Sequence, residues 1–244
     1  NSPGRISIES DFIQETGGEL VLELGGTVPG DDYDLVTVNG AATLGGCLRI
    51  ECLENDPPAM GAIFTPFVAT SMTGVFDEVV IDALSSRLLF DLMISDTGVT
   101  ATANALDVSN FADWRTAVFN AEELADDTVS GSLADPDEDG LVNLMEYALD
   151  GNPKRFHQPG LIALNFQRDM EGKVEFVLAE FPWANGTSDI GYELQSSADL
   201  ENWVRLESEV TGIAEADFTT RLSLRAAFGD PEYSYVRLSV FKRP

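Results

Sequence analysis

The sequence predicts a mainly β protein in three parts: a β-rich part at residues 1–106, a short helical segment at 107–155 and a small β-sandwich at 156–244. Three observations support this division. Over the first hundred residues, short runs of alternating apolar and polar residues are separated by Gly-Gly and Gly-Asp pairs, a pattern typical of strands joined by turns. After Asp107 the apolar residues follow helical spacing, and alternation returns from about residue 161.

An internal repeat suggests how the strands of the first part are arranged. Residues 17–24 align with residues 45–52 at an offset of 28, and the same offset places Ile8 with Val36. This offset fits one coil of a β-solenoid; a pair of similar hairpins in a β-sandwich is the alternative. A solenoid needs a cap over its terminal coil, and the apolar residues of 62–102 could supply one.

The two cysteines lie in the second copy of this repeat. Cys47 and Cys52 are five residues apart, and this odd spacing puts them on opposite faces of a strand. Because a disulfide between them would require a bent strand, we expect two thiols.

Three short helices are expected in the middle segment. The first includes Phe111 and Trp114, with Ser109 or Asn110 as its N-cap. The second starts after Asn120, which has capping-box spacing to Glu123. The third starts at about Asn143 and ends at Gly151-Asn152-Pro153, because Gly and Pro terminate helices.

The last part contains six alternating runs with turn residues between them, which predicts a β-sandwich. We expect Tyr192 and Trp203 to fill its core, since large aromatic residues are mostly buried. The alternative is that Trp183 and Trp203 line a sugar-binding face. The six runs span residues 161–166, 174–181, 192–196, 203–207, 218–224 and 235–241.

Composition excludes several classes of function. Lys and Arg number 14 against 42 Asp and Glu, a formal net charge of −28, so we expect neither a nucleic-acid partner nor an anionic membrane surface. No run of about 18 apolar residues occurs, so we expect no membrane insertion. The single histidine, His157, excludes His pairs, Ser-His-Asp triads and the usual Cys/His zinc sites. No catalytic residues can be named, and we expect a protein that is not an enzyme.

One motif carries specific chemistry. Residues 135–146 match the twelve-residue calcium loop, in which alternate side chains deliver oxygens to one point and a Gly at position six allows the sharp turn. Gly140 occupies that position. The middle segment is therefore interpreted as a helical calcium-binding linker. Its predicted Ca²⁺ ligands are Asp135, Asp137, Asp139, the carbonyl of Leu141, Asn143 and Glu146.

Clustered acidic residues more often form a solvated loop, and that is the alternative interpretation. Four carboxylates at this spacing would repel one another without a cation, which favours a bound ion. Magnesium fits less well because it demands octahedral geometry and retains its waters. Since only one loop is present, we expect a structural ion and not a calcium switch. Other acidic pairs, such as Asp31-Asp32 and Glu122-Glu123, are interpreted as solvated faces.

These motifs resemble the carboxyl-terminal regions of large exported proteins of Verrucomicrobia and Planctomycetes. The loop itself is similar to those of dockerins and thrombospondin type 3 repeats. The first part resembles the last coils of autotransporter-like β-helix proteins, and the last part resembles the small β-domain that often ends those chains. The residues that carry the resemblance are 111–114, 134–149 and 152–153 for the linker, 17–77 for the coils, and 192–197 with Leu200 and Trp203 for the last part.

The resemblance implies a bacterial extracellular or cell-surface location and an adhesive, scaffolding or assembly role. Dockerins have two calcium loops, so we do not expect docking to a cohesin here. Secretion also fits the physics, because a low-affinity calcium site stays filled only where calcium is plentiful and salt screens the self-repulsion of a charge of −28. The chain begins with Asn1, which suggests a piece of a longer protein.

The leading hypothesis is a calcium-stabilised surface protein whose partners are further copies of itself, in a fibre or surface layer, or a cell-surface polysaccharide. A carbohydrate-binding module is the first alternative. The second is the terminal fragment of a β-helical polysaccharide lyase or hydrolase, which would use paired carboxylates such as Asp31 and Asp34. His157 is interpreted as a linker residue, and the glycosylation pattern beginning at Asn185 carries little weight because such short matches are frequent.

Overall fold

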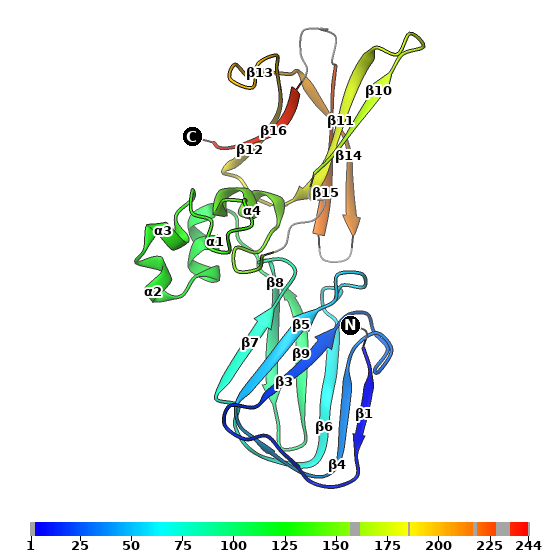
Figure 1. The fold of residues 1–244 in the computed structure, drawn as a ribbon, viewed down its shortest axis with the longest axis vertical. Helices are drawn as coiled ribbons and strands as arrows, with labels where there is room; N and C mark the ends of the chain where they lie inside the picture. The colour runs from blue at the N-terminus through cyan, green and yellow to red at the C-terminus, as the bar shows by residue number, and fades with distance from the viewer. Residues whose placement is uncertain (1–2, 157–161, 185, 217–218, 228–234, 244) are drawn as a thin grey trace. The chain divides into compact units, whose positions relative to one another are not determined.

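The protein is described by a computed structural model that covers residues 3–156, 162–184, 186–216, 219–227 and 235–243. It is 50% strand and 10% helix, which confirms the mainly β prediction. The chain forms two compact units, residues 1–106 and 107–244 (Figure 1). The first boundary coincides with the predicted one, and the helical segment lies in the same unit as the strands that follow it.

Two sheets make up the amino-terminal unit. In the first sheet the order is β1-β4-β6-β9-β8, with β2 also paired to β4, and in the second it is β3-β5-β7. The pairs among β1 to β7 are parallel, whereas β9 is antiparallel to both β6 and β8. The strands are β1 (Arg5–Ile8), β2 (Phe12–Ile13), β3 (Glu19–Leu24), β4 (Leu35–Leu44), β5 (Cys47–Cys52), β6 (Ile63–Gly74), β7 (Glu78–Asp82), β8 (Leu88–Ile94) and β9 (Gly98–Ala105).

The register of these strands tests the predicted repeat. Strands β3 and β5 pair with Leu20 opposite Leu48, which is the predicted offset. The predicted partner of Ile8 was wrong by two residues, because Ile8 pairs with Val38. The reason is that the two corners differ in length. Residues 14–18 lie between Ile13 and Glu19, whereas only residues 44–46 lie between their partners Thr43 and Cys47. The offset between paired residues therefore changes across this corner.

Alternate residues of both sheets meet in one core. On β5 the inward side chains of Leu48 and Ile50 are fully buried, as their alternation with polar residues predicts. Cys47 and Cys52 are thiols that form no disulfide with each other, the first half-buried and the second buried, so the expectation of two thiols on opposite faces is confirmed. Gly46 has a φ of +61°, and a Cβ atom there would lie 2.2 Å from the carbonyl oxygen of Gly18, so this tight corner requires glycine.

Four short helices open the second unit: α1 (Phe111–Val118), α2 (Ala121–Leu124), α3 (Asp127–Ser130) and α4 (Asn143–Leu149). The predicted caps are confirmed. Asn110 Oδ1 accepts from the N–H of Asp113, and Asn120 and Glu123 form a capping box. Helix α3, capped by Asp126, was not predicted, because its four residues contain no apolar periodicity.

Two further sheets complete this unit, in the orders β10-β11-β15-β14 and β13-β12-β16. Both sheets and α4 contribute to one hydrophobic core, which includes Phe181 from β11, Leu194 from β12 and Leu149 from α4. The strands are β10 (Ala163–Arg168), β11 (Val174–Trp183), β12 (Ile190–Ser197), β13 (Val204–Arg205), β14 (Ser208–Ala216), β15 (Thr219–Ala227) and β16 (Tyr235–Lys242).

The placement of Trp203 in this core was wrong. Trp203 is half-buried, with the guanidinium of Arg237 4.0 Å from its ring centroid, whereas Tyr192 does pack against the core. Strand β14 was not predicted, because a bulge between Val210 and Gly212 interrupts its alternation. Leu161 and Phe218, the first residues of two expected runs, lie outside the described residues.

Candidate metal centre

Three of the predicted ligands come together between α3 and α4. Asp135, Asp137 and Asp139 each place one carboxylate oxygen within 4.8 Å of the others, and all three residues are half-buried. Three carboxylates this close together could hold a metal ion, because a cation offsets their mutual repulsion.

The two oxygens of each carboxylate have different surroundings. One oxygen accepts from a backbone N–H of the loop: Asp135 Oδ2 from Gly140 at 3.0 Å, Asp137 Oδ1 from Asp139 at 3.3 Å, and Asp139 Oδ1 from Leu141 at 2.8 Å. The other oxygen of each is buried and has no hydrogen-bond partner among the residues that the structure describes. Buried polar atoms normally have partners, so these three oxygens are the ones available to an ion.

Backbone conformation makes this arrangement possible. Gly140 has a φ of +95°, a region that glycine adopts readily, and Glu138 has a φ of +61°. Glu138 thus turns the chain between Asp137 and Asp139, and Gly140 turns it directly after Asp139. At the base of the loop the N–H of Asn143 donates to the carbonyl of Ala134 at 2.8 Å, which holds the two ends of the loop together.

A fourth candidate ligand, Asn143, lies at the start of α4. Asn143 is fully buried, and its Nδ2 donates to the carbonyls of Val129 at 2.9 Å and Gly131 at 2.8 Å. Its Oδ1 is buried without a hydrogen-bond partner in the described part of the chain. Asn143 occupies position nine of the loop, where the pattern predicts a ligand.

The other two predicted ligands are placed less specifically. Glu146 is fully buried in the first turn of α4, but it is not part of the three-carboxylate cluster. Leu141 is half-buried and contributes its N–H to Asp139. The predicted set is thus divided into a compact group of aspartates, a buried asparagine oxygen and a buried glutamate.

Electrostatics in the cluster follow from this crowding. Burial raises the pKa of Asp137, and the carboxylates of Asp139 and Asp135 raise it further, while the N–H of Asp139 acts in the opposite direction. A cation bound between the three side chains would favour their charged forms and reverse the effect.

Sequence reasoning overlooked the residues that support the loop. Arg115 on α1 and Ser130 at the end of α3 form a hydrogen-bonded group that holds the two helices together. A single arginine on a helix gives no sequence signal of a buried serine partner 15 residues away.

Two other sequence features can be placed in part. Trp183 packs against the core of the second unit. His157 and Asn185 lie outside the described residues. No helix in the described residues has the length and hydropathy needed to cross a membrane.

Compared with family models, with curated proteins and with solved structures, the chain matches none.

Proposed function

We propose that residues 135–146 bind Ca²⁺ and that the ion has a structural role. The observation that carries this proposal concerns the two oxygens of Asp135, Asp137 and Asp139. In each carboxylate one oxygen accepts from a backbone N–H of the loop, and the other is buried and available to an ion. Asn143 Oδ1 adds a fourth oxygen, and the carbonyl of Leu141 and the carboxylate of Glu146 would complete the shell.

The donor set favours calcium over other ions. All the candidate ligands are oxygens, which suit hard cations, whereas zinc prefers the nitrogen and sulfur of His and Cys. Ca²⁺ accepts six to eight oxygens in flexible geometry, while Mg²⁺ demands a near-ideal octahedron and retains waters. A loop that offers up to six protein oxygen ligands therefore fits Ca²⁺ better.

A structural role fits the surroundings better than a sensor role. Calcium sensors open a pair of helices around each loop, but α3 has four residues and α4 has seven. Leu149 of α4 also belongs to the core of the second unit. Helix α4 is therefore poorly suited to move when the ion binds.

For the amino-terminal unit we propose coils of a β-solenoid. Its support is that residues which pair or form hydrogen bonds between successive coils are separated by similar numbers of residues along the chain. Asp34 accepts from the N–H of Gly4, and Asp11 from that of Ala41, both 30 residues away. The parallel pairs have similar offsets, such as Leu48 with Val79. The antiparallel strands β8 and β9 would then be the cap, and the two sheets of the second unit a β-sandwich.

From these parts we propose a calcium-stabilised structural or adhesive protein of the cell surface or the extracellular space. Strands β1 and β3 lie at the ends of their sheets, and free edges of this kind pair with further strands, which supports self-assembly. A carbohydrate-binding role is less favoured, because Trp183 packs against the core and Arg237 covers Trp203.

Calorimetric titration of chelator-treated protein with Ca²⁺, with Mg²⁺ as comparison, tests the metal site. Asp137→Asn is the test variant and Glu138→Gln the control, because both remove one charge from the loop and Glu138 is exposed. We expect one Ca²⁺ site in the wild type and in Glu138→Gln, and a large loss in Asp137→Asn. At a free Ca²⁺ concentration about 100 times Kd, the ion should stabilise the fold by about 2.7 kcal/mol. No binding at millimolar Ca²⁺ would refute the proposal.

Light scattering tests assembly separately. We expect particles that grow with protein concentration in the presence of Ca²⁺. A chain that stays monomeric at high concentration with calcium bound would refute self-assembly while leaving the metal site intact.

A further inference from the structure

The first two residues of α4, Asn143 and Leu144, donate hydrogen bonds to the end of α3 and to the residues that follow it. The N–H of Leu144 donates to the carbonyl of Ser132 at 3.1 Å, and that of Asn143 to the carbonyl of Ala134. The side chain of Asn143 adds two bonds, to the carbonyls of Val129 and Gly131. Four carbonyls between residues 129 and 134 therefore depend on the start of α4.

Asn143 can make these bonds in only one orientation. Two carbonyl oxygens can accept only from the amide NH₂, so the Oδ1 of Asn143 must point away from Val129 and Gly131. That oxygen is the buried atom without a hydrogen-bond partner in the described residues, at the ninth position of the loop. With the proposed metal site loaded, one rigid amide group would join the ion to the carbonyls of Val129 and Gly131.

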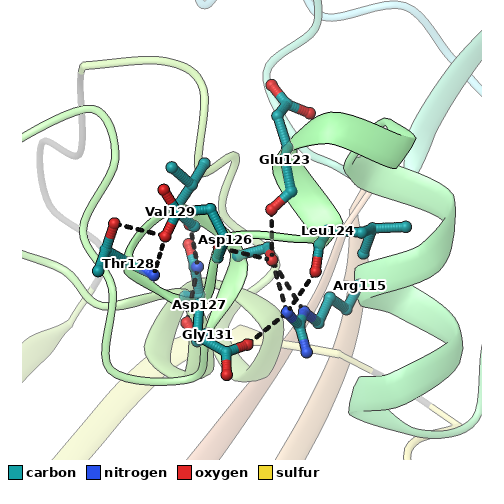
Figure 2. Close-up of polar contacts among 10 residues, drawn as sticks. Arg115, Glu123, Leu124, Asp126, Asp127, Thr128, Val129 and Gly131 are labelled. Atoms are coloured by element: carbon teal, nitrogen blue, oxygen red, sulfur yellow. Dashed lines mark hydrogen bonds and ion pairs between the residues drawn. The ribbon is translucent and has the colours of Figure 1, made fainter.

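Ser130 and Arg115 continue these contacts. Figure 2 shows the guanidinium of Arg115 directed at the carbonyl of Leu124 and the carboxylate of Asp127. Ser130 is fully buried, and its Oγ accepts from Arg115 Nη2 at 2.7 Å and Nε at 3.0 Å. Nη2 also donates to Asp127 at 2.6 Å and to the carbonyl of Leu124 at 3.1 Å. The contacts therefore run from the loop through Asn143 and α3 to α1 and α2.

Helices α2 and α3 are too short to be stable alone. Each has four residues, and isolated helices shorter than about 12 residues are marginal in water. Gly131 is also tightly placed, since a Cβ atom there would lie 2.3 Å from the carbonyl oxygen of Asp127. Besides the caps at Asn120 and Asp126, the tertiary contacts of Ser130, Arg115 and Asn143 therefore contribute to the order of these helices.

We propose that Asn143 is a positioning residue through which metal loading orders residues 121–132. This inference rests on the proposed metal site. An ion on Oδ1 fixes the amide plane and strengthens its N–H bonds by polarisation, so Val129 and Gly131 are held firmly only when the site is loaded. Without the ion, the amide is freer to rotate, and α3 loosens together with its bonds to Arg115.

The segment under this control lines a groove of about 900 Å³. Arg115 and Thr116 of α1 form one part of its lining, and Asp127 of α3 with Ser132 and Leu133 forms another. The shape of this groove should therefore depend on the metal.

Hydrogen exchange followed by mass spectrometry on the full chain, with Ca²⁺ and with chelator, tests the coupling. The reporter amides are those of Val129, Ser130 and Gly131, which donate to the carbonyls of Asp126 and Asp127. We expect their exchange in the wild type to slow by about tenfold or more on loading, as for a local opening suppressed by a ligand.

Asn143→Asp separates the two roles of the side chain. Aspartate keeps an oxygen ligand but has no N–H₂ to donate, so calorimetry should still show Ca²⁺ binding while the slowing of the three reporter amides is lost. Asn165→Asp, at an exposed position on β10, is the charge-matched control and should behave as the wild type.

Each contrary result has a separate meaning. If calorimetry shows Ca²⁺ binding to the wild type but the reporter amides exchange at the same rate with and without it, the coupling is refuted and the metal site stands. If Asn143→Asp keeps the full slowing, Asn143 is not the coupling residue. If Asn143→Asp does not fold, Ser130→Ala replaces it: Ca²⁺ binding should persist while the Ca²⁺-dependent slowing of the reporter amides falls, and full slowing would refute the path. A wild type that binds no Ca²⁺ refutes the proposed function itself.

Discussion

Replacing Tyr147 by phenylalanine should destabilise the second unit. Tyr147 is fully buried on α4, and its hydroxyl donates to Asp189 Oδ1 at 2.9 Å. Asp189 Oδ2 accepts from the N–H of Phe111 at 2.8 Å. One carboxylate therefore joins the start of α1, the middle of α4 and the residue before β12.

The expected magnitude follows from the geometry. Phenylalanine keeps the ring and its contacts with Phe111 and Trp114, whose centroids lie 5.6 and 5.5 Å away, so no cavity forms. What is lost is a hydrogen bond to a charged group, which contributes about 1.5–3 kcal/mol. Because Asp189 is half-buried, water can replace part of that bond, and we expect a loss near the lower end, about 1.5–2 kcal/mol.

Tryptophan fluorescence during urea unfolding measures this loss in the right unit, because all three tryptophans lie at or after position 114. With a slope of about 2 kcal/mol/M, the midpoint should fall by about 0.75–1 M. Tyr235→Phe is the control, since Tyr235 is 44% exposed, and it should shift the midpoint little. Equal midpoints for the two variants would refute the role assigned to Asp189.

Three further predictions concern other parts of the chain. Ile50→Ala should destabilise the amino-terminal unit by about 2–5 kcal/mol, because Ile50 is fully buried between the two sheets; far-UV circular dichroism during urea unfolding measures it, and a loss below about 0.5 kcal/mol would contradict the core assignment. Hydrogen bonds from the N–H and side chain of Asn202, together with others from the same turn, lower the pKa of Asp199. This carboxylate therefore stabilises the turn at pH values above its unfolded pKa, and the stabilisation is lost as the pH falls towards its lower folded pKa. An NMR titration that showed an ordinary pKa near 3.9 would contradict this. In the native protein Cys47 should be alkylated slowly, since burial and then the carboxylates of neighbouring residues raise its pKa. Cys52 is buried and should be alkylated only on unfolding. Mass spectrometry that found Cys52 modified first would show that the strand faces are wrongly assigned.

Local sequence patterns predicted the individual helices and strands better than they predicted which residues pair between strands. The N-caps at Asn110 and Asn120 were predictable because a cap depends on residues within one turn. The offset of Leu20 and Leu48 was also visible, because both copies have the same alternation. The partner of Ile8 was not, since it depends on the number of residues in the corner after β2, which no apolar pattern records.

The candidate site shows the same division between local and distant information. Spacing alone brought Asp135, Asp137 and Asp139 together, because a tight loop fixes alternate side chains on one side. The support of Asn143 by the carbonyls of residues 129 and 131 was not predictable, since main-chain oxygens have no sequence signature. The prediction that Trp203 fills the core was wrong for a related reason. Arg237, whose guanidinium lies over the Trp203 ring, is distant in sequence.

The acidic composition has a structural explanation that charge counting overlooks. Tight corners leave backbone N–H groups that no strand partner can reach, and a short carboxylate side chain can accept from them. Asp32, interpreted as part of a solvated face, accepts from the N–H groups of Thr27 and Val28, and Asp77 accepts from the N–H of Gly46 at the corner before β5. The metal loop uses the same chemistry, with one oxygen of each aspartate on a loop N–H. It differs in that the second oxygen of each is buried, and water cannot offset the repulsion there. That difference is the basis of our proposal that this loop, unlike the corners, binds a cation.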